Sequence, residues 1–98
     1  MTLGQILKAI QKNASTLKEE HHVRALYLFG SFARGEGTPK SDVDLLVEFS
    51  SAEITLFGLI RLKLFLESLL KRRVDLVTRD ALTDSLREEL EKDSIRAA

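Results

Sequence analysis

Residues 30–49 read GSFARGEGTPKSDVDLLVEF, and this stretch decides the fold. Its second half predicts a β-strand over 42–49, because the odd-numbered positions are all apolar and successive strand side chains point to opposite faces. The even-numbered positions include Asp42 and Asp44, so both aspartates are expected on the face that points away from the core. The first half holds three of the five glycines and the only proline, which predicts a loop over 30–40 with unusual backbone freedom.

A helix and a strand are expected before this stretch. Apolar residues spaced by three and four predict a helix that Thr2 caps and that fades near Glu20. Its apolar stripe consists of Leu3, Ile6, Leu7, Ile10, Ala14 and Leu17. The segment Val23 to Phe29 is apolar on both faces apart from Arg24, which predicts an interior strand.

A helix, a strand and a second helix are expected after it. Apolar spacing predicts a helix over about 54–71, a strand over 74–78 and a last helix marked by Leu82, Leu86 and Leu90. Residues 94–98 are expected to fray.

The resulting order, α-β-β-α-β-α, predicts a single α/β domain over residues 1–98 with a small mixed sheet and flanking helices. The helical crossover between the second and third strands allows them to lie parallel and adjacent. Asp75, which interrupts the third strand, would then reach the face that carries Asp42 and Asp44.

Composition excludes several classes of function. Lys plus Arg and Asp plus Glu each number 15, so the formal net charge is zero and direct nucleic-acid binding is not expected. The absence of cysteine excludes disulfides, a zinc ribbon and a thiol nucleophile, and fits a reducing compartment. The longest apolar stretch, 54–70, contains three charged residues, and residues 1–11 do not resemble a signal peptide. We therefore expect a cytoplasmic protein with no membrane partner.

The three aspartates are candidate metal ligands. On a strand, the Cα atoms of Asp42 and Asp44 lie about 6.5–7 Å apart on one side, and Asp75 would supply a third oxygen ligand. Oxygen ligands with no histidine or cysteine nearby suit Mg²⁺ or Mn²⁺ rather than zinc. Because magnesium usually completes its shell with substrate phosphates, this set predicts a nucleotide site. Asp75 is also a candidate general base for an attacking hydroxyl.

The glycine-rich loop supplies candidate phosphate ligands. Gly30 and Ser31 directly follow a strand, and a short helix beginning there would offer free N–H groups and the Ser31 hydroxyl to a phosphate. The missing side chain of Gly30 would allow close approach. Arg34 and Lys40 are the nearby cations, although either can be a loop-bracing or solvated charge. Ser41, beside the aspartate pair, completes the candidate set.

Together these residues form the pattern G-S-x10-D-x-D with an isolated aspartate on the next strand. The segments 30–35 and 41–47 resemble the signature of the DNA polymerase beta-like nucleotidyltransferases, and the short chain is similar to the minimal nucleotidyltransferases of bacteria and archaea. The resemblance extends from about residue 3 to residue 90. It implies that Asp42, Asp44 and Asp75 hold two divalent metal ions, and that Gly30 and Ser31 contact the triphosphate of ATP.

The same resemblance implies a partner and an activity. Members of this family are typically encoded beside a HEPN-domain toxin, which is a ribonuclease, and act as its antitoxin. Some transfer AMP from ATP to a tyrosine of that toxin. The implied enzyme is a Mg²⁺-dependent protein nucleotidyltransferase, and its short chain suggests that the acceptor brings its own binding surface.

Two other functions remain open. The chain could be a non-catalytic antitoxin that neutralises its partner by stoichiometric occlusion, although occlusion does not require three aligned aspartates. Transfer to a small molecule such as an aminoglycoside would need an acceptor pocket supplied by dimerisation.

Some features have a structural interpretation beside the functional one. The run 71–73, KRR, fits a solvated helix end better than a contact with RNA or with an acidic patch of a partner. Arg34 can brace its loop through Glu36 or Asp44. The apolar face of the helix over 54–70 is widened by Phe57, Leu64 and Leu70, which leaves a docking surface open.

Overall fold

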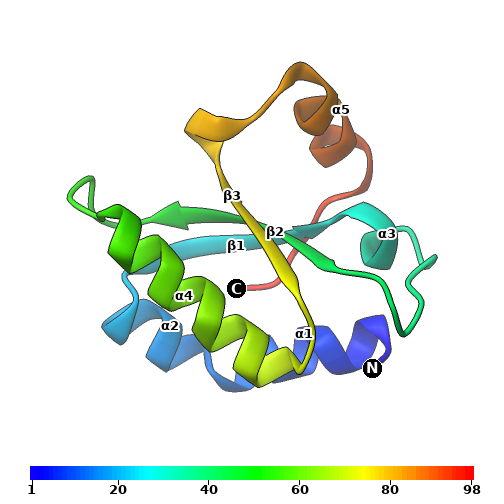
Figure 1. The fold of residues 1–98 in the computed structure, drawn as a ribbon, viewed down its shortest axis with the longest axis horizontal. Helices are drawn as coiled ribbons and strands as arrows, with labels where there is room; N and C mark the ends of the chain where they lie inside the picture. Colours follow the sequence, from blue (N-terminus) through cyan, green and yellow to red (C-terminus); the bar gives the residue numbers. More distant parts are fainter.

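The computed structural model describes residues 1–98 and contains one mixed sheet with five α-helices (Figure 1). The helices are α1 (Leu3–Lys12), α2 (Ala14–Glu20), α3 (Gly30–Ala33), α4 (Leu56–Leu70) and α5 (Asp84–Asp93), and a 3-10 turn, η1, covers Arg79–Ala81. The strands are β1 (Val23–Phe29), β2 (Val43–Phe49), β3 (Val74–Thr78) and β4 (Ile95–Arg96). The predicted α/β class with a small mixed sheet is confirmed.

The strands lie in the order β3-β2-β1-β4. β1 pairs antiparallel with both β2 and β4, whereas β2 and β3 are parallel and are connected through α4. The predicted parallel pairing of the second and third strands is therefore confirmed. Because parallel strands begin at the same edge of a sheet, the residues that open β2 and β3 lie together.

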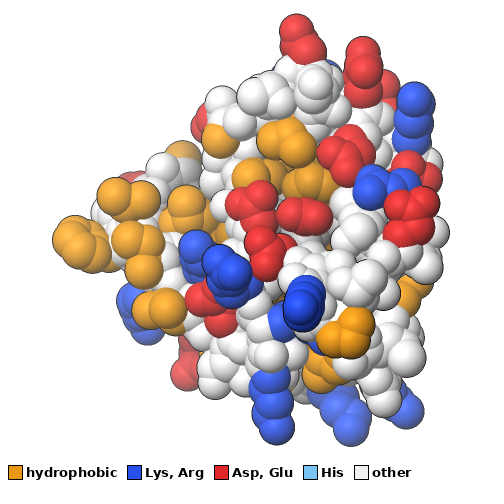
Figure 2. All heavy atoms as spheres, turned by 45° about the vertical axis from the view of Figure 1, so that its right-hand side comes forward, with side chains coloured by type: hydrophobic (Ala, Val, Ile, Leu, Met, Phe, Trp, Pro, Cys, Tyr) orange, Lys and Arg blue, Asp and Glu red, His pale blue; other side chains and the backbone are white.

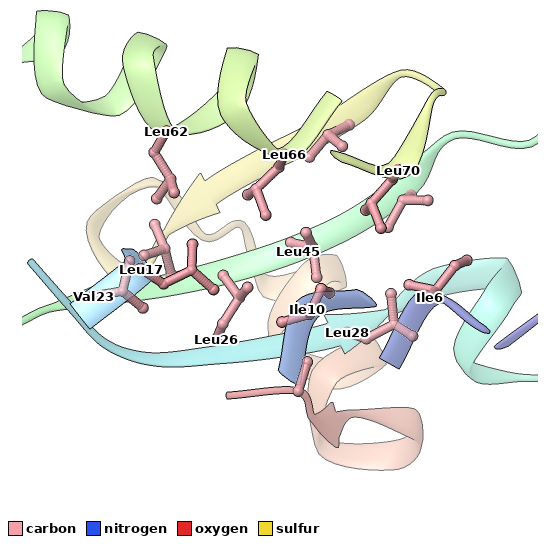
Figure 3. Close-up of a cluster of buried hydrophobic side chains, with 14 of the residues drawn as sticks. Ile6, Ile10, Leu17, Val23, Leu26, Leu28, Leu45, Leu62, Leu66 and Leu70 are labelled. Carbon is pink, nitrogen blue, oxygen red and sulfur yellow. The ribbon is translucent and has the colours of Figure 1, made fainter. Parts of the chain in front are cut away.

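The main core lies between one face of the sheet and α1, α2 and α4 (Figures 1 and 3). Val43, Leu45 and Val47, the odd-numbered positions of β2, are no more than 1% exposed. Side chains from three helices meet this face, as Figure 3 shows: Ile6, Ile10, Leu17, Leu62, Leu66 and Leu70. Full burial of a Leu, Ile or Val side chain stabilises a fold by about 1.5–3 kcal/mol, so the packing of this layer fixes the position of β2.

The opposite face of the sheet is partly covered by α5. Phe29, Leu46 and Leu90 form a second, smaller cluster there. Leu46 is an even-numbered position of β2, so the face that carries Asp44 is apolar at its centre and acidic at its edge.

The predicted first helix is two helices. Thr2 caps α1 as expected, and its hydroxyl accepts a hydrogen bond from the Gln5 N–H at 3.2 Å. The backbone then leaves helical geometry at Asn13, with φ −108° and ψ 18°. The Asn13 side-chain amide donates to the Ala9 carbonyl at 2.9 Å, so this residue closes α1 before α2 begins.

The expected fraying of residues 94–98 is wrong. Ile95 and Arg96 pair with Leu28 and Tyr27, and the Ala97 N–H donates to the Leu26 carbonyl at 2.7 Å. The outer edge of β1 leaves backbone groups without partners, and the C-terminal residues satisfy them. Ala97 is consequently buried.

The helix α4 starts two residues later than predicted, at Leu56, where the Thr55 hydroxyl accepts from the Gly58 N–H at 3.4 Å. Its last residue is Leu70, and the capping residue Lys71 adopts the left-handed conformation with φ +55°. None of the helices has both the length and the apolar character needed to cross a bilayer.

Candidate active site

Asp44 and Asp75 are neighbours across the parallel pair of β2 and β3. They are Cα partners in the register, which places their Cα atoms about 4.8 Å apart. Paired residues of adjacent strands point to the same face, so both carboxylates lie on the side that faces α5. Figure 2 shows acidic side chains gathered near the centre of the face that carries this edge of the sheet.

Asp42 lies immediately before β2, two residues from Asp44 and on the same side of the chain. One of its carboxylate oxygens is 3.8 Å from the Arg73 Nε, in a pair whose side chains are 51% and 86% exposed. An exposed ion pair at this distance holds its members weakly. Asp42 can therefore turn toward Asp44 at little cost.

Gly30 leaves room for the Asp44 carboxylate. Its φ is +76°, a conformation that residues with a side chain rarely adopt. A Cβ at this position would also overlap the Asp44 carboxylate and lie 2.9 Å from its Cγ. The missing side chain was expected to give room to a phosphate, and the structure shows that it gives room to Asp44.

Asp44 stands in a negative environment. Partial burial, followed by the charges of Asp75, Glu89 and Asp42, raises its pKa to about 6, while Arg34 acts in the opposite direction. The proximity of several carboxylates with one opposing cation makes this edge a place that favours a bound cation.

Arg34 is held by two glutamates. Its Nε donates to Glu36 at 3.2 Å, and a terminal nitrogen donates to Glu89 of α5 at 2.8 Å. The Glu89 bond, and then the Glu36 bond, raise the pKa of Arg34. The interpretation that Arg34 braces its loop through Glu36 is thus confirmed. Arg34 makes no hydrogen bond to Asp44. Glu89 is a member of this site that the sequence analysis missed.

The remaining candidate phosphate ligands differ in whether their side chains already have partners within the chain. Ser31 lies in the first turn of α3, and its hydroxyl has no hydrogen-bond partner within the chain. The Ser41 hydroxyl accepts from the Thr38 N–H at 2.9 Å and is 3.0 Å from the Thr38 hydroxyl, so it closes the turn before Asp42. The Lys40 side chain is exposed and makes no ion pair.

Arg72 organises the loop that leads into β2. Its terminal nitrogen donates to the Thr38 carbonyl at 3.2 Å and to the Ser41 carbonyl at 3.1 Å. Its guanidinium also lies 4.9 Å from the centroid of the Phe32 ring in α3. The prediction that 71–73 is a solvated helix end is therefore wrong for Arg72, which links both segments of the candidate site.

Comparisons with known proteins agree with this geometry. A family model described as a nucleotidyltransferase domain matches residues 7–97. The chain belongs to this nucleotidyltransferase family. The resemblance seen in the glycine-rich loop and the aspartate pair is confirmed.

Individual relatives are close in length to this nucleotidyltransferase. "Putative protein adenylyltransferase MJ0126" of Methanocaldococcus jannaschii is 36% identical over 95 residues, which are 96% of each chain. "Protein adenylyltransferase MntA" of Thermococcus cleftensis is 38% identical over 86 residues, which cover 88% of this chain and 86% of the relative. A solved structure titled "putative minimal nucleotidyltransferase" is 41% identical, covers 97% of this chain and 95% of its own, and has a TM-score of 0.79.

The acidic edge suits the divalent cations that nucleotidyltransferases use. The donors are carboxylate oxygens, which Mg²⁺ and Mn²⁺ prefer. As they stand, no three acidic or histidine side chains are close enough to enclose an ion. Asp44 and Asp75 are already backbone neighbours and Asp42 is weakly held, so closure of the three around an ion would require their side chains to rearrange. The residues fit a cation in composition and backbone placement.

The sequence contained only faint signals for Glu89 and Arg72. Glu89 is one of several acidic residues in the last helix, and nothing local sets it apart. Arg72 belongs to a basic run, and its aromatic contact is with a residue 40 positions earlier. Both roles come from the tertiary arrangement.

Proposed function

We propose that this nucleotidyltransferase is a Mg²⁺-dependent protein adenylyltransferase that transfers AMP from ATP to a hydroxyl, with tyrosine as the expected acceptor. The expected substrate is a HEPN-domain ribonuclease toxin encoded by a neighbouring gene, and the modification makes this chain its antitoxin. The observation that carries the proposal is the register pairing of Asp44 with Asp75 beside the Gly30–Ser31 turn.

The relatives support the choice of acceptor. The curated relatives are named protein adenylyltransferases and span nearly the same length as this chain. Solved toxin–antitoxin complexes share the fold, including one titled "Crystal structure of the toxin-antitoxin with AMP-PNP", at 22% identity, a TM-score of 0.71 and coverage of 90% of this chain and 72% of that one. A protein acceptor is therefore favoured over a small molecule.

The acidic residues would act on both the cation and the acceptor. Asp42, Asp44 and Asp75 would hold divalent cations, which offset the charge of the triphosphate during transfer. Asp75 is exposed, so an acceptor hydroxyl can reach it. The hydroxyl oxygen would bond to the α-phosphorus of ATP while its proton passes to the Asp75 carboxylate and pyrophosphate leaves. Asp44, whose carboxylate occupies the space left by Gly30, would fix the cation relative to β2.

The loop residues would orient the nucleotide. The free Ser31 hydroxyl and the N–H groups at the start of α3 would bind phosphate oxygens. Arg34 stands at the same end of the sheet but is occupied by Glu89 and Glu36. Its contribution to phosphate binding would require exchange of the Glu89 bond, so Gly30 and Ser31 are the primary phosphate residues.

The test is the intact mass of the HEPN-domain protein after incubation with this chain, ATP and Mg²⁺. We expect a gain of one or more AMP units with the wild-type protein and with Asp84→Asn, an exposed aspartate outside the site. Asp44→Asn should give no gain while remaining folded. A mass gain at the wild-type rate with Asp44→Asn would overturn the proposal. Absence of any gain beside a stable complex would instead favour the occlusion antitoxin.

A further inference from the structure

The first half of α4 carries an apolar stripe that the fold leaves uncovered. Leu56, Phe57, Ile60 and Leu64 are 69%, 78%, 43% and 58% exposed, and they recur at the spacing that places residues along one side of a helix. The buried side of the same helix is formed by a separate row that contains Leu62. Figure 2 shows hydrophobic side chains protruding at the left of the molecule, where α4 begins in Figure 1. Contiguous exposed apolar side chains of this kind mark interaction sites.

Basic residues border this stripe on both sides. At 100° per residue, Arg61 falls along one edge and Lys63 along the other. Both are exposed, and neither takes part in any of the ion pairs of the chain. Glu20 and Glu53 line a hollow beside Arg61 but lie outside ion-pair distance of it. The first turn of α4 contains no acidic residue, so the positive end of the helix dipole adds to this border.

The charges disfavour a second copy of this chain as the occupant. In an antiparallel pair of identical helices, the edge with Arg61 meets the same edge of the copy, and the edge with Lys63 does likewise. In a parallel pair, Arg61 of one copy meets Lys63 of the other. Either arrangement sets like charges against each other along both sides of the apolar contact. A different protein with acidic residues at those places would instead form pairs at both edges.

The stripe continues into a cleft. A cavity of about 400 Å³ opens between the end of β2, the start of α4 and η1, and Leu56 and Leu59 line it together with Phe49. Arg24 and Arg79 stand on its wall and share a single glutamate, Glu48, at 3.4 and 3.1 Å. This combination of a protruding aromatic side chain, an apolar row and an adjacent cleft suits the docking of a helix, with Phe57 as an anchor.

This surface lies away from the aspartates. Asp44 and Asp75 are near the beginning of β2 and β3, whereas α4 begins after the end of β2 and runs back toward the beginning of β3 (Figure 1). A helix seated on the first half of α4 therefore leaves the acidic edge accessible.

We propose that the exposed stripe of α4, with Arg61 and Lys63 at its borders, is the docking surface for the protein acceptor, and that it receives an amphipathic helix with an apolar row flanked by acidic residues. The proposal rests on the proposed function only for the identity of the acceptor. Docking at one end of the sheet would hold the substrate while its hydroxyl reaches the other end.

The experiment uses the proposed HEPN-domain acceptor as the probe and measures two quantities: the dissociation constant by calorimetry and the AMP mass gain. The variants are Phe57→Ser/Ile60→Ser and Arg61→Glu/Lys63→Glu, which change exposed side chains. Lys8→Glu/Lys12→Glu is the matched control, because these lysines are exposed and unpaired on α1. We expect each stripe variant to weaken binding by about 30-fold or more, and the control to bind within about twofold of wild type.

The possible results separate this proposal from the proposed function. Wild-type affinity in both stripe variants, or no complex with the wild-type protein, overturns the docking surface, whether or not AMP is transferred. A complex that the stripe variants lose, without any mass gain in the wild type, supports docking and overturns the transferase role. A wild-type dimer in sedimentation that Phe57→Ser/Ile60→Ser dissolves would also overturn docking of the acceptor, because the stripe would then bind a second copy.

Discussion

The Asp44 carboxylate occupies the space that a side chain at Gly30 would fill. Gly30 directly follows β1 and Asp44 is the second residue of β2, so this contact joins the glycine-rich loop to the acidic edge of the sheet. The fold itself therefore requires a glycine at position 30.

Gly30→Ala should be destabilising and inactive. The left-handed backbone at this position and the overlap with Asp44 together should cost about 2–4 kcal/mol of unfolding free energy. Urea unfolding measures the loss. Gly35→Ala is the control, because Gly35 has the same positive φ but open space around its Cβ position. An equal loss in both variants would show that the contact with Asp44 has no effect.

The contribution of Asp44 to the stability of the metal-free protein should fall as the pH rises from about 4 to 6. Asp44 has a pKa of about 6 in the fold and 3.8 as its ordinary value, so the folded protein binds a proton more tightly than the unfolded chain between these pH values. Thermal unfolding in EDTA measures this slope. Asp44→Asn should flatten it and should stabilise the protein at pH 7 by about 1 kcal/mol, after allowance for solvent screening of a half-buried carboxyl. An unchanged slope in the variant would contradict the assignment.

Divalent cations should restore the stability that the protein loses when Asp44 ionises. Above pH 6, Mg²⁺ should raise the melting temperature of the wild-type protein, because a cation offsets the repulsion among Asp42, Asp44 and Asp75. The increase should be absent in Asp44→Asn and retained in Asp84→Asn. Equal shifts in all three proteins would place the cation elsewhere.

Removal of the Glu89 charge should lower the pKa of Asp44. Glu89 is one of the carboxylates that raise it, so Glu89→Gln should move the Asp44 titration below pH 6. The same change weakens the hydrogen bond to Arg34. Side-chain NMR titration of Asp44 gives the result directly. Glu88→Gln, an exposed neighbour on α5, is the control and should leave the titration where it is.

Arg72→Lys should destabilise the loop that leads into β2. Lysine keeps the charge but cannot donate to both carbonyls and stack on Phe32 as the guanidinium does, so we expect a loss of about 1–2 kcal/mol. Hydrogen exchange should increase at the amides of residues 38 and 40–42. The adjacent Arg73→Lys changes an exposed side chain and should have little effect. Similar exchange in the two variants would remove Arg72 from the organisation of the loop.

Much of the fold follows from local pattern. The alternation in β2 correctly predicts that Val43, Leu45 and Val47 face the core, because strand side chains alternate regardless of distant contacts. The crossover rule then predicts the parallel pairing that places Asp75 beside Asp44. These two rules are sufficient to predict the acidic edge.

The parts that were not predicted depend on contacts between distant residues. The last residues pair with β1 because that strand has a free edge, and their own sequence has no strand signal. Arg34 bonds to Glu89, 55 residues away, and Arg72 reaches Thr38, 34 residues away. Such partners are determined only when the helices are placed on the sheet.

The most direct test of the account is a reaction with one molecule of this protein for every hundred molecules of the HEPN-domain partner, followed by intact mass after incubation with ATP and Mg²⁺. An enzyme turns over, so the account predicts that the whole partner pool gains AMP and loses ribonuclease activity. Loss of ribonuclease activity in only one molecule in a hundred, without any mass gain, would contradict it and identify the chain as a stoichiometric inhibitor.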